Sequence, residues 1–280
     1  MMYYTEDTIL YLDGKWIKAK DAGVSLYNQS LHYGNAVFEG VRSYDTEDGV
    51  LIFKAREHYD RLRFSAQKMH IPLTYTSEEL TKISYELLER NNLTNAYLRP
   101  LVYPGENMSL FAGEESHVLL CAWEWGRYLG DTLLKLMTSS FQRPNPKACF
   151  VEAKVTGHYT NSILATTEAK QKGFDEALLL DAQGYVAEGP GANFFYEKDD
   201  ILFTPKLGNI LPGITRQTIL ELANEMGVEV RERQFTIDAV YQADGAFFTG
   251  TAAEVAGIES LDGNKFGLHW SDTIGSELSR

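Results

Sequence analysis

The feature that most constrains the fold is a series of short strand-like segments interrupted by turns that contain glycine. Residues 9–12 and 16–17 flank Asp13-Gly14, a pattern typical of a β-hairpin. Residues 38–44 and 50–53 flank a second turn and predict another hairpin. The sequence lacks the regular alternation of strand and helix that builds a doubly wound parallel sheet. It therefore predicts an α+β class with mainly short, antiparallel strands.

Helices are predicted at a few places between these strands. Residues 56–69 have helical spacing, and the next helix begins after Thr76, which can cap it because Glu79 follows three residues later. In the second half, helices are predicted at 162–172 and 215–226, each followed by a glycine that suits a left-handed end. The predicted strands that remain are 96–102, 117–123, 133–139, 176–180, 185–187, 193–196, 201–204, 245–249 and 254–258.

The middle of the chain marks a predicted boundary. Residues 126–131 show no convincing periodicity, and we interpret them as an interdomain loop. The chain has 280 residues and 44% hydrophobic residues, which suffices for two domains with their own cores. We therefore expect an N-terminal α+β domain over 1–125 and a C-terminal domain over 132–280.

The charge balance limits the class of partner. The chain has 26 Lys and Arg against 39 Asp and Glu, a formal net charge of −13. Phosphate backbones and anionic lipids would repel such a chain, so neither nucleic acid nor a membrane is an expected partner. An anionic ligand must then be held by a local cluster of donors that overcomes the overall field.

The expected compartment is the cytoplasm. No apolar run approaches the roughly 20 residues that a membrane span requires, and the first residues carry acids where a secretory signal carries lysines. Cys121 and Cys149 both lie in apolar context and are expected to be buried thiols in a reducing compartment.

Several common chemistries have no motif in this chain. The dinucleotide-binding, P-loop, nucleophile-elbow and zinc-peptidase patterns are all missing, and the six histidines are scattered. No histidine pairs with a carboxylate or a cysteine at metal-ligand spacing, so no metal site is expected.

Lys154 is a candidate nucleophile. It follows Cys149 in an apolar, strand-like run, where a lysine can simply extend its amine to water. The alternative is a partly desolvated amine, which loses its proton more readily and can form a Schiff base.

Three further segments combine a structural and a functional interpretation. Glu188 precedes Gly189-Pro190-Gly191 and is either an exposed turn residue or a carboxylate that partners a protonated ring nitrogen. Residues 212–216 open a helix, whose start is either a plain cap or a phosphate site. Residues 249–254 form either a polar turn or a set of donors for a second anion.

Taken together, these segments resemble one enzyme family. Lys154, Glu188, residues 213–215 and residues 250–254, in that order, resemble the class IV aminotransferases, the fold-type IV pyridoxal-phosphate enzymes. Tyr33-Gly34 and residues 38–42 look like the amino-terminal signature of the family, and residues 56–62 look like its helix with the phosphate-binding arginine. The resemblance implies the two-domain fold of D-amino-acid aminotransferase, with a small N-terminal α/β domain and a larger, barrel-like C-terminal α/β domain.

Within the family, residues 96–100 and 125–130 look most like branched-chain amino-acid aminotransferases. Such an enzyme converts leucine, isoleucine or valine with 2-oxoglutarate into 2-oxo acids and L-glutamate. A D-amino-acid or (R)-amine aminotransferase, an aminodeoxychorismate lyase and a non-catalytic binding protein with the same fold are the alternatives. The sequence departs from the family pattern at His158, at Glu124 and in a short loop over 105–117, where the substrate side chain would be recognised.

The resemblance also implies a role for each matching residue. Lys154 would carry pyridoxal 5'-phosphate as a Schiff base and move the substrate proton. The other implied cofactor-binding residues are Arg61, Tyr159, Glu188, Ile214, Thr215 and Thr251. The implied substrate-binding residues are Tyr33, Phe38, Gly40, Tyr97, Arg99, Tyr128, Thr251 and Ala252. Family members form a homodimer or an assembly of dimers, with Tyr33 supplied by the neighbouring subunit.

Overall fold

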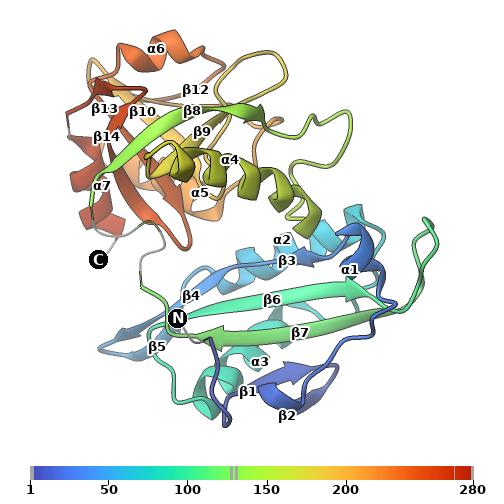
Figure 1. The fold of residues 1–280 in the computed structure, drawn as a ribbon. Coiled ribbons are helices and arrows are strands. Elements are labelled where there is room, and N and C mark those ends of the chain that lie inside the picture. The colour runs from blue at the N-terminus through green and yellow to red at the C-terminus, as the bar shows by residue number, and fades with distance from the viewer. Residues whose placement is uncertain (1–2, 127–128, 130–131, 268, 279–280) are drawn as a thin grey trace. The chain divides into compact units, whose positions relative to one another are not determined.

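The fold is described from a computed structural model that covers residues 3–126, 129, 132–267 and 269–278 (Figure 1). The chain divides into two compact units. The first contains Met1–Gly126 together with Ala153–Gly157, and the second contains Arg127–Glu152 and His158–Arg280. A short return segment, Ala153–Gly157, therefore belongs to the first unit although it follows part of the second in sequence.

The first unit is built on one antiparallel sheet. Its elements are β1 (Ile9–Leu12), β2 (Lys15–Lys18), a 3-10 turn (Ala19–Asp21), α1 (Gln29–Tyr33), β3 (Val37–Phe38), β4 (Val41–Thr46), β5 (Gly49–Ile52), α2 (Ala55–Lys68), α3 (Ser77–Arg90), β6 (Ala96–Pro104) and β7 (Ser116–Trp123). The sheet has the order β2-β1-β7-β6-β4-β5, and β3 pairs with β6. All strand pairs described here are antiparallel, which confirms both predicted hairpins.

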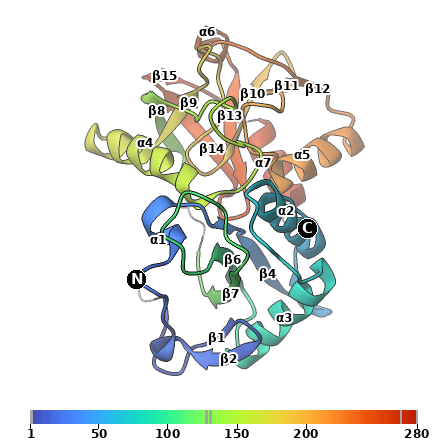
Figure 2. The same cartoon turned by 90° about the vertical axis from the view of Figure 1, so that its right-hand side faces the viewer.

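Helices α2 and α3 lie on the same side of this sheet and supply its core (Figure 2). Leu62 of α2 and Leu80 and Leu87 of α3 are completely buried. The predicted start of α3 is confirmed: Thr76 accepts the backbone N–H of Glu79, and the Glu79 carboxylate accepts the backbone N–H of Thr76. This reciprocal capping box fixes the helix start where the apolar face must begin.

The predicted strand over 38–44 is wrong in one respect, because it is interrupted after Phe38. Glu39 and Gly40 form no strand and separate β3 from β4. A Cβ atom at Gly40 would lie 2.0 Å from the Tyr97 hydroxyl, so this position needs a residue without a side chain. The interruption turns the Glu39 side chain into the interior, where it is completely buried.

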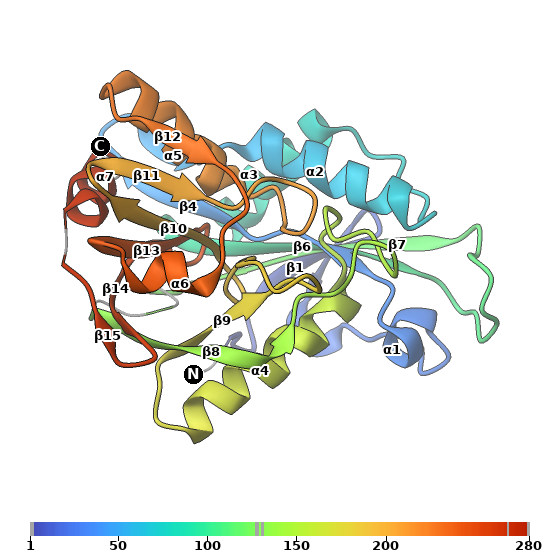
Figure 3. The same cartoon turned by 90° about the horizontal axis from the view of Figure 1, so that it is seen from above.

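The second unit is built on a mixed sheet. Its elements are β8 (Leu134–Gln142), α4 (Tyr159–Gln171), β9 (Glu176–Leu180), β10 (Asn193–Lys198), β11 (Ile201–Thr204), α5 (Ile214–Glu225), β12 (Val230–Glu232), α6 (Ile237–Tyr241), β13 (Gly245–Gly250), β14 (Glu254–Leu261), β15 (Asn264–Lys265) and α7 (Trp270–Leu278). A 3-10 turn (Thr156–His158) precedes α4. The sheet order is β12-β11-β10-β13-β14-β8-β9, with β15 on β14. Helix α4 packs along β8 and β9, and α5 packs on β12 and β13 (Figure 3).

The observed elements of the second unit differ from the predicted ones at a few places. Residues 185–187 do not form the predicted strand but only an isolated bridge between Leu180 and Val186. The Asp181 carboxylate accepts the backbone N–H groups of Gln183 and Tyr185 and thereby holds this segment in a local turn. Helices α1, α6 and α7 and strands β12 and β15 were not predicted. The parallel pairs of β8 with β9 and β14, and of β11 with β12, also go beyond the predicted antiparallel pattern.

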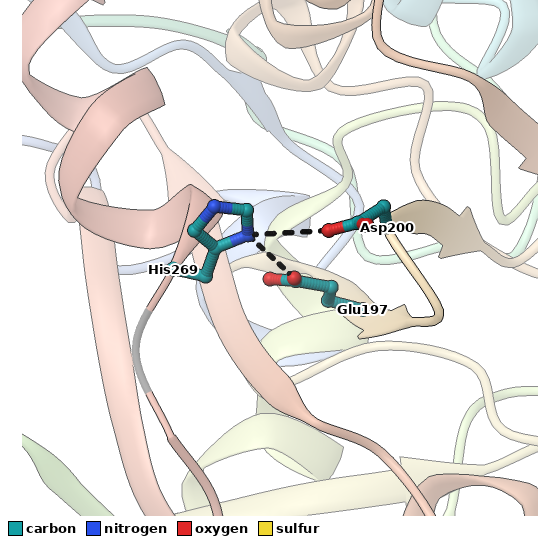
Figure 4. A group of neighbouring side chains, drawn as sticks. All are labelled: Glu197, Asp200 and His269. Atoms are coloured by element: carbon teal, nitrogen blue, oxygen red, sulfur yellow. Dashed lines mark hydrogen bonds and ion pairs between the residues drawn. The ribbon is translucent and has the colours of Figure 1, made fainter.

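A buried carboxylate fixes the start of α7. One Glu197 oxygen accepts the Trp270 backbone N–H at 3.2 Å, and the other lies 2.7 Å from His269 Nδ1 (Figure 4). The exposed Asp200 carboxylate lies 3.8 Å from the same ring nitrogen. A negative charge is favourable at a helix N-terminus, so Glu197 anchors a helix that the sequence alone did not reveal.

None of the helices in the described part of the chain is long and apolar enough to cross a membrane.

Candidate functional site

The return segment places Lys154 beside β3 in the first unit. The Lys154 backbone N–H donates to Ser65 Oγ of α2 at 3.0 Å, and its carbonyl accepts the Phe38 N–H at 3.1 Å. Val155 pairs with Val37, and both are buried. The backbone on both sides of Lys154 is therefore fixed independently of the contacts of its side chain.

The Lys154 side chain is half-buried rather than fully extended into water. Its Nζ lies 4.9 Å from the centre of the Phe38 ring. An aromatic face attracts an ammonium group but replaces only part of its hydration shell. The amine therefore lies between a fully solvated and a fully buried position, and its role as a nucleophile stays a prediction.

Two glycines determine how closely the return segment approaches α1. Gly157 N–H donates to Gly34 O at 2.7 Å, and Gly34 has a positive φ of 69° at the end of α1. A Cβ atom at Gly157 would lie 2.6 Å from that carbonyl oxygen. The contact that closes the return segment therefore requires glycine at position 157.

Behind the lysine segment lies a buried charged cluster that we call the Glu39 cluster, formed by Glu39, His58 and Arg61. The Arg61 guanidinium donates to both Glu39 oxygens, from Nε at 2.7 Å and from Nη2 at 2.9 Å. His58 Nδ1 lies 2.7 Å from Glu39 Oε2. Glu39 and His58 are almost inaccessible to solvent, and the Arg61 side chain is 10% exposed.

The electrostatics of this cluster set the protonation of its members. Burial alone would raise the pKa of Glu39, but the Arg61 charge and the hydrogen bonds from His58 and Arg61 outweigh it and lower the pKa to about 2. Burial lowers the pKa of His58, and the charges of Arg61 and Lys154 add to this effect against the opposing influence of Glu39. The folded protein therefore contains an ionised Glu39 and a neutral His58.

Tyr97 and Arg99 share one face of β6. Leu98 between them is completely buried in the core under the helices, so alternation along the strand directs Tyr97 and Arg99 to the opposite face. Arg99 Nη2 donates to the Tyr97 hydroxyl at 3.1 Å, and its guanidinium carbon lies 4.7 Å from the centre of the Phe38 ring. The Phe38 ring thus contacts both Arg99 and Lys154.

Tyr33 and Gly40 are the remaining predicted residues of the first unit. Tyr33 ends α1, is 46% exposed and donates its hydroxyl to the Met108 carbonyl at 3.2 Å. Gly40 lies against the Tyr97 hydroxyl. Tyr128 lies outside the described residues, so its predicted role stays a prediction.

In the second unit, Glu188 is the centre of a second buried cluster, which we call the Glu188 cluster and which includes Arg143, Asn193 and Leu211. Glu188 Oε1 lies 2.8 Å from Arg143 Nε, and both side chains are less than a tenth exposed. Asn193 Nδ2 donates to Glu188 Oε2 at 2.8 Å, and the Leu211 backbone N–H donates to the carboxylate at 3.1 Å. The predicted exposed-turn interpretation of Glu188 is therefore wrong, since the carboxylate is buried and fixed.

Asn193 connects this carboxylate to the start of α5. Its amide also donates to the Leu211 carbonyl at 3.0 Å, and a Cβ atom at Gly213 would lie 1.9 Å from its Oδ1. Gly213 is the N-cap of α5 and forms no side-chain cap, so Ile214 and Thr215 begin the helix without one. An uncapped helix start presents backbone N–H groups and the positive end of the helix dipole.

The predicted turn after β13 lies next to the segment that contains Gly191 and Asn193. Asn193 pairs with Thr249 across the sheet, and a Cβ atom at Gly250 would lie 3.3 Å from the Gly191 carbonyl. Thr251 and Ala252 form the turn that follows, and both are in contact with other groups. Tyr159 is the first residue of α4 and is half-buried.

Five residues that build these surroundings were not predicted to be functional. Glu39 and His58 lie inside the segments that carry the family resemblance, but nothing in their spacing indicates that they meet. Ser65 and Arg143 carry no sequence signal, and Asn193 follows the glycines after Glu188 without a distinguishing pattern.

The family assignment follows from comparison with known proteins. The model of the family described as amino-transferase class IV matches residues 36–261, a range that contains both buried clusters and Lys154. The chain belongs to the class IV aminotransferase family.

Relatives of this class IV aminotransferase cover nearly its whole length. A branched-chain-amino-acid aminotransferase of Pseudomonas aeruginosa is 46% identical over 280 residues, which cover 98% of this chain and 91% of the relative. The crystal structure of the branched-chain aminotransferase from Thermoproteus uzoniensis with norvaline has a TM-score of 0.95 and 36% identity, covering 98% of this chain and 94% of the other. A further branched-chain amino acid aminotransferase, complexed with N-(5'-phosphopyridoxyl)-L-glutamate, has a TM-score of 0.92 and 34% identity, covering 99% and 94%. These comparisons confirm the predicted fold-type IV, two-domain α+β fold.

The Glu39 cluster predicts how stability depends on pH. The unfolded chain protonates His58 below its usual pKa of 6.5 and Glu39 below 4.5, whereas both folded groups resist protonation. The cofactor-free protein should therefore lose stability as the pH falls through 6.5, and again between 4.5 and about 2. Replacing His58 with Asn should flatten the first part of this curve.

Urea unfolding midpoints measured at a series of pH values test this prediction. The matched control is His70→Asn, since His70 is exposed and has a positive φ of 55° that asparagine tolerates. A control that flattens the curve as much as His58→Asn would contradict the prediction.

Proposed function

We propose that the chain transfers the amino group of leucine, isoleucine or valine to 2-oxoglutarate, giving branched-chain 2-oxo acids and L-glutamate. The observation that carries this proposal is the Phe38 ring in contact with both Lys154 and Arg99. This arrangement combines a candidate nucleophile, an apolar surface and a cation for a distal carboxylate. The names of the relatives, and the norvaline and phosphopyridoxyl-glutamate bound in two of them, support the same reaction.

The side chains present fit pyridoxal 5'-phosphate as the cofactor. Lys154 offers a half-buried amine, and the uncapped start of α5 offers N–H groups at Ile214 and Thr215 for a phosphate. We assign further phosphate contacts to Arg61 and Thr251.

Glu188 would keep the ring nitrogen protonated, and its fixed position in the Glu188 cluster suits that task. Tyr159 would donate to the phenolic oxygen.

When bound, pyridoxal phosphate supplies an electron sink for the bond broken at the substrate α-carbon. The protein supplies the proton transfer: Lys154 Nζ would remove the proton from the substrate α-carbon and deliver it to the C4′ carbon of the cofactor. The fixed backbone on both sides of Lys154 limits the positions that its amine can reach.

The substrate has two parts to be recognised. We assign its α-carboxylate to Tyr97, to the backbone at Gly40 and to the Thr251-Ala252 turn. Phe38, Tyr33 and Tyr128 would surround a branched side chain. Arg99 would bind the distal carboxylate of glutamate or 2-oxoglutarate, since a guanidinium can donate two parallel hydrogen bonds to a carboxylate.

The reaction and the nucleophile can be tested together. With 2-oxoglutarate as the acceptor, L-leucine, L-isoleucine and L-valine should react, and borohydride should attach the cofactor to Lys154. Lys154→Ala should lower kcat by about four orders of magnitude, because no amine remains to move the proton. Lys147→Ala is the control, as Lys147 is exposed and seven residues away in the sequence.

Activity with D-alanine or (R)-amines and none with the branched-chain L-amino acids would instead support the sister enzymes. A protein without a visible absorption band would support the non-catalytic alternative.

If Arg99 binds the distal carboxylate, its replacement should affect the KM for 2-oxoglutarate more than the KM for L-leucine. Arg99→Met should raise KM for 2-oxoglutarate about 100-fold, since a bidentate charged contact is lost, and leave KM for L-leucine within a few-fold. Single-turnover rates for each half-reaction measure the two effects separately. An equal loss for both substrates would show that Arg99 supports the site only in a general way.

We further propose a homodimer or an assembly of dimers. Large apolar side chains are exposed around α1 and the loop after β6, which we call the α1 surface: Val24, Leu26, Tyr27, Leu31, Tyr33, Met108, Leu110 and Phe111. Hydrogen bonds join the two segments, from Asn107 N–H to the Tyr27 carbonyl and from the Gln29 amide to the Phe111 carbonyl. A contiguous apolar surface of this kind is typical of a protein–protein interface, and a second copy of the chain would also bring Tyr33 to its partner's substrate.

Charge on the α1 surface should therefore dissociate the assembly. Leu110 and Phe111 are 87% and 79% exposed, so replacing both with Glu should leave the fold intact and shift the protein towards monomers in sedimentation velocity. Leu207→Glu, at another exposed leucine, is the control. A double variant that sediments like the unmodified protein would exclude this surface as the interface.

We assign the enzyme to the cytoplasm. Cys121 and Cys149 are both free thiols, which fits a reducing compartment.

A further inference from the structure

One ring nitrogen of His58 in the Glu39 cluster takes no part in the proposed reaction. His58 is 1% exposed, and its Nδ1 contacts Glu39. Its other nitrogen, Nε2, is buried and has no hydrogen-bond partner among the described residues. A buried polar atom without a partner is uncommon in folded proteins and often marks a position where a ligand or an ion binds.

The contact with Glu39 decides which nitrogen carries the proton. An ionised carboxylate only accepts hydrogen bonds, so Nδ1 must be the donor at 2.7 Å. In the neutral ring, Nε2 then has a lone pair and no donor. If the ring gains a proton, Nε2 becomes a buried N–H donor beside an anion-binding arginine.

The charges around the imidazole favour an additional anion. Glu39, from the turn after β3, neutralises one positive charge, whereas Arg61 on α2 and Lys154 on the return segment both act on the ring as cations. Arg61 lies one helical turn after His58 on the same face of α2. A phosphate monoester carries a charge between about −1.5 and −2 near neutral pH and three acceptor oxygens, with a second pKa of about 6.

Building on the proposed cofactor role of Arg61, we propose that His58 is a further phosphate-binding residue. When the dianion binds, one proton from solvent adds to Nε2, and the resulting N–H donates to a phosphate oxygen. Glu39 stabilises the imidazolium from the other side of the ring. Without the ligand, burial and the nearby cations keep the same ring neutral and hold its pKa low.

Two variants separate the nitrogens of the ring. Asparagine places its amide near the position of Nδ1, so His58→Asn can keep the contact with Glu39 and lacks Nε2. Glutamine reaches the position of Nε2, so His58→Gln keeps a neutral donor there and loses the contact with Glu39. Neither variant can take up the proton.

The experiment compares pyridoxamine 5'-phosphate with pyridoxamine on the cofactor-free protein by titration calorimetry at pH 8. Neither ligand has an aldehyde, so Lys154 forms no bond with them. Measurement in two buffers with different ionisation enthalpies gives the number of protons taken up. The unmodified protein should take up more protons with the phosphorylated ligand than with pyridoxamine.

His58→Asn should remove this extra uptake and weaken pyridoxamine 5'-phosphate binding about 10- to 100-fold, as expected for a lost charge-assisted hydrogen bond, with pyridoxamine affinity unchanged. His58→Gln should also remove the uptake but weaken binding less. Unchanged affinity and uptake in His58→Asn would overturn the proposal and leave His58 as a structural partner of Glu39.

A spectroscopic measurement on the unmodified protein covers the case in which the variants do not fold. The 15N chemical shift of His58 Nε2 should move to the protonated range when pyridoxamine 5'-phosphate binds. An Nε2 that stays unprotonated would overturn the proposal. If the unmodified protein binds neither ligand, the cofactor assignment itself fails, which is a different result.

Discussion

The ionised Glu39 carboxylate in the interior of the first unit is the interaction on which the proposed site depends. A buried charge is costly unless a partner neutralises it and hydrogen bonds satisfy its oxygens. Arg61 and His58 provide both, and both belong to α2. The same helix contributes Ser65, which holds the backbone of Lys154. Helix α2 therefore carries the partners of Glu39 and also holds the backbone of Lys154, the proposed nucleophile.

The second unit also contains a buried carboxylate that an arginine neutralises. Glu188 is buried beside Arg143, and Asn193 and a backbone N–H satisfy its oxygens. In a chain with a net charge of −13, each of these two buried carboxylates has its own arginine. Local pairing of this kind lets both carboxylates stay ionised in the interior, because each buried charge is neutralised where it lies.

The sequence predicted the parts of the fold that depend on neighbours along the chain. The α3 capping box and both hairpins of the first unit follow from short-range patterns and are confirmed. The start of α7 depends on Glu197, a partner 73 residues earlier than Trp270, so no local pattern could reveal it. The same limit applies to the site. The apolar run around Lys154 left two interpretations open, and only the family resemblance gave the lysine a role. The contact between Glu39 and His58 forms only when the fold brings them together, so no pattern along the chain indicates it.

The approach of Gly157 to Gly34 has a consequence for attempts to redesign the enzyme. Gly157, three residues after the proposed nucleophile Lys154, packs directly against the Gly34 peptide, with no room for a methyl group between them. Libraries that diversify the surroundings of Lys154 should leave this pair untouched. A larger residue there would displace the backbone that carries the amine, and the resulting loss of turnover could be mistaken for a change in substrate preference.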